Sequence, residues 1–471
     1  MKRISFLLLS LMTNIFFAQS DNYKTVVDLF QDDYNSGKYE GIYSSFSPEM
    51  QKAMPFESTK EFFAGLKLQV GKIESKEFID YHQKTYAVYK TKFERAILSV
   101  NISLDDQNKV NGLFVKPYVE SDEHNAETDN KIVNALHDFP KNINEAIFSN
   151  TKAYPNNTQI SIAFIENGKT HFYGIIKQND TIKSIRNQNK VFEIGSITKA
   201  FTSTVLASLV QDKKVNLNDN INSYYSLPFK GNSQLNFKSL ANHTSGLPRL
   251  PNNLDLTNES NPYKNYGKKE IENYLKNNLK LESNPLTKYS YSNLGAGLLG
   301  YTLGLSQKTT FQQLLQKRIF DKYKMNNSYT SSENLKDKLV NGLNANGEIV
   351  PNWDFDVLFG GGGILSTTED LAKFVEAQFN AENTELSLTR KPTFTVNEKM
   401  KIGLGWHILK NKDKSEYFWH NGGTGGYSSS LAFSAENKNA VIILSNVSAF
   451  NPKMGNIDKL CFELMNTATK K

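Results

Sequence analysis

Residues 192–210 read FEIGSITKAFTSTVLASLV, and this stretch decides the fold of the larger part of the chain. Its apolar side chains recur at every fourth position: Ile197, Phe201, Val205 and Leu209. That spacing predicts a buried amphipathic helix. Ser196 lies at the start of this helix, where free backbone N–H groups favour negative charge, and Lys199 falls on the same face. A serine hydroxyl needs a nearby base or cation to become a nucleophile, so the pattern predicts an activated serine.

The Ser-x-x-Lys spacing is weak by itself, because Ser149 and Lys152 repeat it. The second copy runs into Ala153-Tyr154-Pro155-Asn156-Asn157, which cannot continue a helix, and we interpret it as a chance match. A serine at this position can also serve only as a helix cap. Further residues must therefore decide whether Ser196 is catalytic.

Composition limits the possible classes of protein. The chain has 471 residues with 39% hydrophobic and 12% aromatic content, which leaves room for two or three domains with true cores. Lys and Arg number 55 against 48 Asp and Glu, without a dense basic run, which argues against nucleic-acid binding. The single cysteine, Cys461, excludes an internal disulfide, and the seven histidines show no metal-ligand spacing. We expect neither a metal nor a cofactor.

The first 18 residues are predicted to be a signal peptide. Lys2 and Arg3 precede an apolar run from Ile4 to Leu11, and Ala18 is a candidate cleavage site. An uncleaved membrane anchor is the alternative, although Thr13 and Asn14 interrupt an already short apolar run. No later segment is apolar for long enough to span a bilayer. The sequence thus predicts a periplasmic or secreted protein with no stable membrane span in its mature form.

The mature chain is predicted to contain two domains. Residues 19–120 are expected to form a small α+β domain of unknown role, with a helix followed by an antiparallel sheet. Its predicted elements are a helix over 25–34 and strands over 86–93, 96–104 and 110–115. Residues 121–130 are polar and acidic, which is typical of a linker, and residues 131–471 form the second unit.

The second unit has strand patterns at both of its ends. They cover residues 159–166, 171–177, 427–433 and 440–445, and a helix is predicted near the C-terminus over 455–466. The region between them is rich in helices and loops. This order suggests one sheet assembled from both ends of the unit, a helical subdomain inserted between them, and a site in the cleft.

Two further motifs follow Ser196 along the chain. One is Tyr289-Ser290-Tyr291-Ser292-Asn293, and the other is His420-Asn421-Gly422-Gly423-Thr424-Gly425-Gly426-Tyr427. With Ser196 and Lys199, these motifs resemble the three elements of the serine β-lactamase and penicillin-recognising hydrolase family. The likeness is to its class C-like branch, which includes class C β-lactamases, D-alanyl-D-alanine carboxypeptidases and esterases. Flanking matches are Phe192–Gly195, Asn242–Pro248 and Gly362–Leu371, and the likeness covers about residues 158–462.

The resemblance implies an α/β (α+β) β-lactamase-like fold, with an antiparallel sheet flanked by helices and a helical subdomain. It implies that Ser196 attacks an acyl carbon. Lys199 and Tyr291 are both candidates for the base, and the sequence does not separate them, although the family favours a coupled pair.

The same resemblance supplies a set of substrate-binding residues. Asn293 is expected to orient a substrate amide, and His420 to line the cleft. The backbone N–H groups of Ser196 and Gly423 are expected to form the oxyanion hole, and Gly422 to let that backbone approach the substrate.

These features predict a serine hydrolase that acts through an acyl-enzyme on a peptide, amide or ester bond. His420 stands where true class C β-lactamases carry a lysine, which favours peptidase or esterase activity over antibiotic hydrolysis. The expected substrate is a small molecule or peptide, such as a cell-wall fragment. The alternative is a non-catalytic protein that binds or senses cell-wall fragments on a hydrolase-like scaffold.

Overall fold

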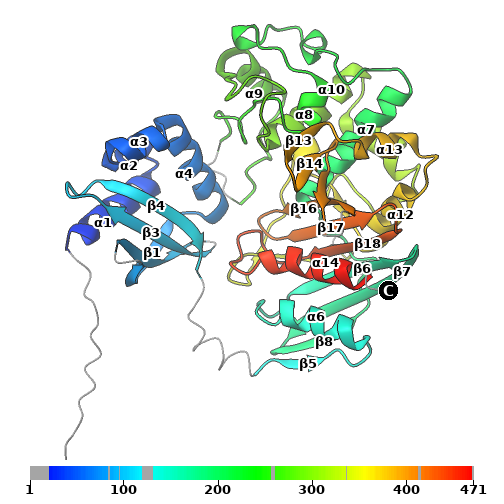
Figure 1. The fold of residues 1–471 in the computed structure, drawn as a ribbon, viewed down its shortest axis with the longest axis horizontal. Helices are drawn as coiled ribbons and strands as arrows, with labels where there is room; N and C mark the ends of the chain where they lie inside the picture. Colours follow the sequence, from blue (N-terminus) through cyan, green and yellow to red (C-terminus); the bar gives the residue numbers. More distant parts are fainter. Residues whose placement is uncertain are drawn as a thin grey trace, which may run out of the picture. The chain divides into compact units, whose positions relative to one another are not determined.

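The computed structural model describes residues 21–82, 85–94, 96–118, 131–255, 260–335, 337–411 and 415–468. These residues form two compact units, the first within residues 21–118 for the most part and the second from residue 131 onward (Figure 1). The predicted signal peptide and the predicted linker lie outside the described residues. Within the described ranges, every helix is too short or too polar to cross a membrane.

The first unit consists of four helices followed by four strands. The helices are α1 (Asp21–Ser36), α2 (Tyr39–Ser45), α3 (Pro48–Ala53) and α4 (Phe56–Val70). The strands form an antiparallel meander: β1 (Ile73–His82), β2 (Tyr86–Phe93), β3 (Ile97–Leu104) and β4 (Val110–Pro117). The alternating pattern predicted β3, yet both of its faces are buried. Asn101 fits there because its amide donates to the carbonyl of Ser99 at 3.2 Å.

The second unit is built on a ten-stranded sheet in the order β13-β14-β15-β16-β17-β18-β6-β7-β8-β5. The strands from the start of the unit are β5 (Val133–Ala135), β6 (Gln159–Glu166), β7 (Lys169–Gln178) and β8 (Thr181–Ile185). Those from its end are β13 (Phe394–Asn397), β14 (Met400–Ile402), β15 (His407–Lys410), β16 (Glu416–Gly423), β17 (Ser428–Ser434) and β18 (Asn439–Ser445). The two groups meet where β18 pairs antiparallel with β6, so the sheet draws on both ends of the unit, as predicted. One detail differs, because β5 runs parallel to β8.

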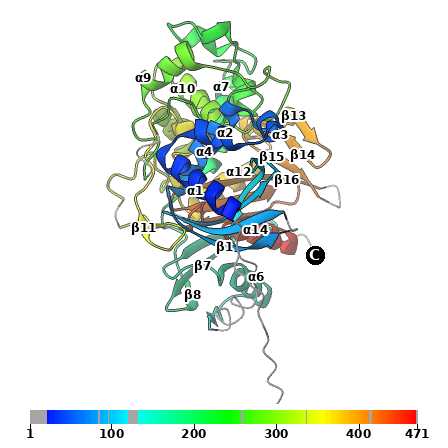
Figure 2. The ribbon, with the colours of Figure 1, turned by 90° about the vertical axis from the view of Figure 1, so that its left-hand side faces the viewer.

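The two faces of this sheet carry different cores, because side chains alternate along each strand. On β6, Ile160 and Ile162 pack with α6 (Lys141–Thr151) and α14 (Gly455–Ala468). Ala163 and Ile165 instead join the core of the helical region. Figure 1 and Figure 2 both place α6 and α14 together beside the sheet. Both faces of the sheet are therefore covered, which agrees with the predicted sheet flanked by helices.

The helical region centres on α7 (Thr198–Gln211), which follows Ser196. Around it lie α8 (Phe237–Ala241), α9 (Lys268–Asn273), α10 (Asn293–Ser306), α11 (Phe311–Leu315), α12 (Thr368–Gln378) and α13 (Thr384–Arg390). The prediction that α7 is amphipathic is wrong, because nearly all of its side chains are buried, including polar ones such as Thr202. Thr202 satisfies its hydroxyl by donating to the Gly360 carbonyl at 2.8 Å. A helix buried on all sides holds its first turn, and hence Ser196, in a fixed place.

Candidate active site

Ser196 lies in a short 3₁₀ turn, Gly195–Ile197, directly before α7. Gly195 has a φ of +50°, and a Cβ there would come within 2.6 Å of the Gly423 nitrogen, so both the backbone and the space require glycine. The Ser429 hydroxyl of β17 donates to the carbonyl of Ile194 at 2.9 Å. The turn that carries the serine is therefore fixed to the end of the sheet.

Lys199 lies beneath Ser196 and is only 2% exposed. Its Nζ is 2.8 Å from Ser196 Oγ and donates to the Gly361 carbonyl at 2.5 Å. Burial lowers the pKa of Lys199 well below its ordinary value, and the positive charge of Arg249 lowers it further. A neutral amine keeps N–H groups for Gly361 and one lone pair, which can accept the Ser196 proton.

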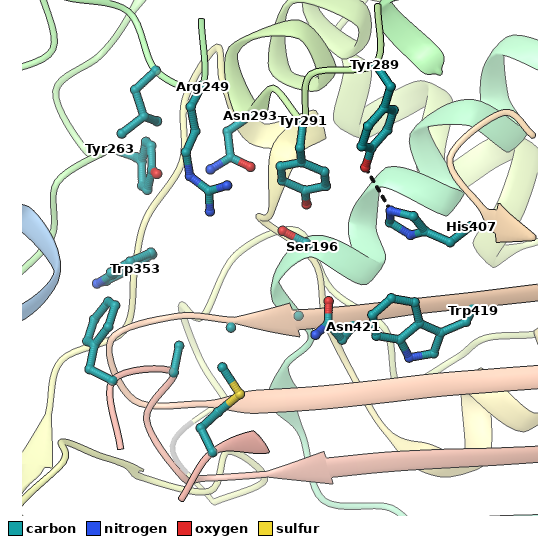
Figure 3. A pocket seen from close by; sticks show the side chains of 16 residues that line it. Ser196, Arg249, Tyr263, Tyr289, Tyr291, Asn293, Trp353, His407, Trp419 and Asn421 are labelled. Atoms are coloured by element: carbon teal, nitrogen blue, oxygen red, sulfur yellow. Dashed lines mark hydrogen bonds between the residues drawn. The ribbon is translucent and has the colours of Figure 1, made fainter. Parts of the chain in front are cut away.

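Tyr291 completes the group that the sequence predicted. Lys199 Nζ lies 4.9 Å from the centre of the Tyr291 ring, and the Ser196 hydroxyl interacts with the phenol. Figure 3 shows the Tyr291 and Ser196 oxygens pointing toward one another. Burial raises the pKa of Tyr291, while Ser196 and Arg249 oppose the rise. Burial therefore favours the neutral form of both groups, and a neutral amine can accept a proton whereas a neutral phenol cannot until it ionises.

His243 supports this arrangement from below, a role that the sequence did not indicate. Its ring lies 4.4 Å from that of Tyr291, and its Nδ1 accepts the N–H of Ser292 at 3.2 Å. Burial lowers its pKa well below the ordinary value, so the ring is neutral. The segment that follows His243 contains Gly246, whose φ of +74° suits a tight turn.

A cavity of about 450 Å³ opens above Ser196. Its lining residues are Ser196, Arg249, Leu250, Tyr263, Tyr289, Tyr291, Asn293, Trp353, His407, Trp419, Asn421, Gly422, Gly423, Ala449, Phe450 and Met454. Figure 3 shows two ends on either side of Ser196. We call them the Arg249 end, with Arg249, Tyr263, Asn293 and Trp353, and the His407 end, with Tyr289, His407 and Trp419.

Five of the predicted site residues line this cavity, whereas Lys199 and His420 do not. His420 is 1% exposed and lies behind the wall, with its ring centre 6.1 Å from that of Tyr291. Its neighbours on β16, Trp419 and Asn421, face the cavity instead. Side chains alternate along a strand, so the third motif presents its asparagine to a substrate and its histidine to the protein interior.

The end of β16 has a free edge beside Ser196. β15 pairs with β16 only as far as Trp419, while β17 continues to pair as far as Gly423. A Cβ on Gly422 would lie 2.1 Å from the Ile194 carbonyl oxygen and 2.9 Å from the Ser196 nitrogen. The backbone of β16 and the turn that carries Ser196 therefore touch at this point, and only glycine permits the contact.

Replacing Gly422 by alanine is expected to push β16 away from Ser196. If these backbones form the oxyanion hole, kcat falls by about 10²–10³-fold. Steady-state kinetics with an activated ester measure the fall, and thermal melting measures stability separately. Gly455→Ala is the matched control, because a Cβ at Gly455 meets no atom within 4 Å. Unchanged kcat in Gly422→Ala would contradict the assignment.

Glu193 has a buried carboxyl group. In the sequence it stands out only as part of the flanking match Phe192–Gly195. Its Oε1 accepts the side-chain amide of Asn352 and the backbone N–H of Trp353, each at 2.8 Å. Burial raises the pKa of Glu193 to about 7, and these hydrogen bonds oppose the rise. Glu193 therefore holds the segment that places Trp353 in the cavity wall.

Glu193 is expected to make stability depend on pH. Between its unfolded pKa of 4.5 and its folded pKa of about 7, the folded protein keeps a proton that the unfolded chain has released. Stability therefore falls as pH rises through this window, by up to about 3 kcal/mol, and stays constant above it. Glu193→Gln keeps both acceptor contacts and should remove this slope, as measured by denaturant unfolding at pH 5 and pH 8. The exposed Glu382→Gln is the control, and equal slopes in both variants would contradict the expectation.

Comparison with known proteins agrees with this geometry. A family model described as "Beta-lactamase" matches residues 150–460. A beta-lactamase from Pseudomonas fluorescens is 26% identical over 261 residues, which cover 53% of this chain and 69% of that protein. Protein flp from Staphylococcus aureus (strain MW2) is 24% identical over 327 residues, which cover 65% of this chain and 63% of its own length.

Solved structures show the same fold. A beta-lactamase/D-alanine carboxypeptidase from Pseudomonas syringae superposes with a TM-score of 0.59 at 22% identity, covering 69% of this chain and 98% of that one. An octameric penicillin-binding protein homologue from Pyrococcus abyssi gives a TM-score of 0.56 at 20% identity, covering 67% and 75%. The fold and the site thus define a scaffold of the serine-hydrolase type. The chain belongs to the beta-lactamase family.

The first unit matches a separate family model. Residues 27–113 match one described as "Protein of unknown function (DUF3887)". This match covers the helices and strands from α1 to β4, apart from their outermost residues. It assigns no activity to the first unit.

Proposed function

We propose that the protein is a serine hydrolase that forms an acyl-enzyme at Ser196 and cleaves a peptide, amide or ester bond. The observation that supports this most directly is the 2.8 Å contact between Lys199 Nζ and Ser196 Oγ beneath an open cavity. A buried amine with a lowered pKa, held against a hydroxyl at the start of a helix, is an arrangement that activates a nucleophile.

The positions of these groups support the following reaction. Lys199 accepts the Ser196 proton as Oγ bonds to the substrate carbonyl carbon, and the bond to the leaving group then breaks. The proton returns to the leaving group by way of the Tyr291 hydroxyl, which interacts with Ser196. Water attacks the resulting ester, releases the acid and restores the serine.

The backbone between Ser196 and Gly423 is the proposed oxyanion hole. The close approach of β16 to the nucleophile turn supports it, since backbone N–H groups there can receive the charge that develops on the carbonyl oxygen. The free edge of β16 from His420 to Gly423 can pair with an extended substrate backbone.

We propose a small substrate of the cell-wall type and activity outside the cytoplasm. The cavity volume suits a short peptide, and the predicted signal peptide supports export. His420, buried and kept neutral by burial, supplies no charge at the place of the third motif, which favours peptidase or esterase over β-lactamase activity.

Covalent labelling tests the proposal. The mature chain is incubated with a fluorophosphonate or with penicillin, and the intact mass is measured. An adduct on Ser196 is the expected result, and a panel of a chromogenic cephalosporin, a short acyl ester and a D-alanyl-D-alanine peptide then sorts the activities. No adduct with either reagent, together with no turnover, would favour a binding protein that has kept the scaffold.

A further inference from the structure

Arg249 occupies a fixed position at one end of the cavity. Its carbonyl accepts the backbone N–H groups of Asn293 and Leu294 at 3.0 and 3.1 Å, which ties it to the start of α10. Its guanidinium carbon lies 5.3 Å from the centre of the Tyr291 ring. Figure 3 shows the guanidinium between Tyr263 and Tyr291, facing the space beside Ser196.

The guanidinium has no carboxylate near it in the cavity. Among the described residues that line this space, Arg249 is the one cation and none is acidic. Its exposed side chain makes no salt bridge within 4.0 Å to the described part of the chain. An arginine fork matches a carboxylate in shape and charge, so an unpaired guanidinium in a substrate cavity is suited to an anionic ligand.

The neighbours of Arg249 indicate what kind of ligand would carry the negative charge. Asn293 Oδ1 is buried without a hydrogen-bond partner in the described structure, so it can accept an N–H of the ligand. Tyr263 and Trp353 form an aromatic wall, with ring centres 5.5 Å apart. The Arg249 end therefore combines a cation, a free acceptor and apolar surface, which together suit a chain of a few atoms that ends in a carboxylate.

The other end of the cavity is different. The Tyr289 hydroxyl oxygen lies 2.9 Å from the Nε2 atom of His407. Burial lowers the pKa of His407 to about 4, so the His407 end is neutral. Because the two ends lie on either side of Ser196, a substrate held across the cavity places its two halves in unlike surroundings.

We propose that Arg249 is a specificity-determining residue that selects acyl groups carrying a carboxylate. This inference rests on the proposed function, since it concerns the acyl half of the substrate that Ser196 attacks. Asn293, on the same end, then accepts from an amide of that acyl half. The leaving half lies at the neutral His407 end and needs no charge.

Matched esters test this selection. The para-nitrophenyl esters of adipate, hexanoate and ε-aminocaproate share a leaving group and a chain length but end in a carboxylate, a methyl group and an ammonium. Wild-type kcat/KM is expected to favour the adipate ester over the hexanoate ester by roughly ten-fold or more, the effect of one charged hydrogen bond. The ε-aminocaproate ester is expected to be the poorest of the three.

Substitutions then assign the preference to one side chain. Arg249→Ala is expected to lower the adipate-to-hexanoate ratio of kcat/KM by roughly ten-fold. Arg249→Glu is expected to reverse the charge preference, so that the ε-aminocaproate ester has a higher kcat/KM than the adipate ester. The ratio cancels any general effect on Tyr291. Lys288→Ala is the matched control, because Lys288 is an exposed cation beside Tyr289 in sequence that does not line the cavity, and it should leave the ratio unchanged.

Two outcomes would overturn the proposal. One is an unchanged ratio in Arg249→Ala. The other is an Arg249-dependent preference for a carboxylate on the leaving group, measured with the hexanoate ester of a carboxylated nitrophenol.

Failure of the hydrolase proposal gives a different result, namely no turnover and no labelling of Ser196. Binding of adipate is then measured by the fluorescence of Trp353 and Trp419, which line the same cavity. A dissociation constant raised about ten-fold in Arg249→Ala would still support the anion site, and an equal constant would reject it.

Discussion

Ser196→Ala is expected to reduce turnover of any accepted ester or peptide by about 10⁴-fold or more and to abolish the fluorophosphonate adduct. Loss of a nucleophile has an effect of this size because no neighbouring group can form the acyl-enzyme in its place. The Lys199 amine is next to Ser196, but it is held by the Gly361 carbonyl. Initial rates with a para-nitrophenyl ester and intact mass spectrometry provide the two measurements.

The second Ser-x-x-Lys copy supplies a matched control for this variant. Ser149 lies near the end of α6, outside the cavity, and its hydroxyl donates to the Ala146 carbonyl at 3.1 Å. Ser149→Ala should therefore keep both rate and labelling. Turnover retained by Ser196→Ala would remove the basis of the proposed mechanism.

Lys199→Met is expected to lower kcat by about 10²–10⁴-fold, the usual contribution of a positioned base. Methionine fills a similar space without an amine, so Ser196 keeps its place but loses its proton acceptor. In the wild type, kcat/KM should rise with pH as Lys199 becomes neutral, and its lowered pKa places this rise well below the pH at which an ordinary lysine titrates. The pH profile of the variant should lack that acid limb.

Lys199→Arg separates the charge of this residue from its basicity. A guanidinium stays protonated, so the variant places a permanent cation at this position that cannot accept the serine proton, and it should be as slow as Lys199→Met. Lys152→Met, in the second copy of the spacing, is the control and should match the wild type. A fast Lys199→Arg enzyme would mean that the positive charge alone suffices, with Tyr291 as the base. Circular dichroism verifies that each variant is folded.

The sequence predicted that Ser196, Lys199 and Tyr291 belong to one site, because short motifs contain all three. Ser196 and Lys199 are one helical turn apart, and that distance is set by local geometry. Tyr291 lies close to these two residues only because of the overall fold, and its position there was predicted from the family resemblance. The sheet of the second unit was also predictable, since the strands predicted over residues 159–166, 427–433 and 440–445 overlap β6, β17 and β18.

Other features depended on packing that no local pattern encodes. Whether His420 or Asn421 faces the cavity is set by the register of β16 against its neighbours, and a shift by one residue would exchange them. The burial of nearly all side chains of α7 follows from the elements around it, which its own spacing does not reveal. Arg249 and Glu193 gain their significance from what lies beside them in space, and neither stands in a pattern that names a role.

Joining strands from both ends of the second unit has a consequence for biosynthesis. The hydrogen bond from Ser429 to the Ile194 carbonyl spans 235 residues, and the one that ties Gln159 to Asn446 spans 287. Such distant pairings form late, because a long loop must close before they contribute. A ribosome that has just completed α7 has made Ser196 but not the strand, β17, whose Ser429 holds the turn before it. Under the proposed function, a product that ends before β18 is expected to be inactive, because it lacks the strand that joins β17 to β6.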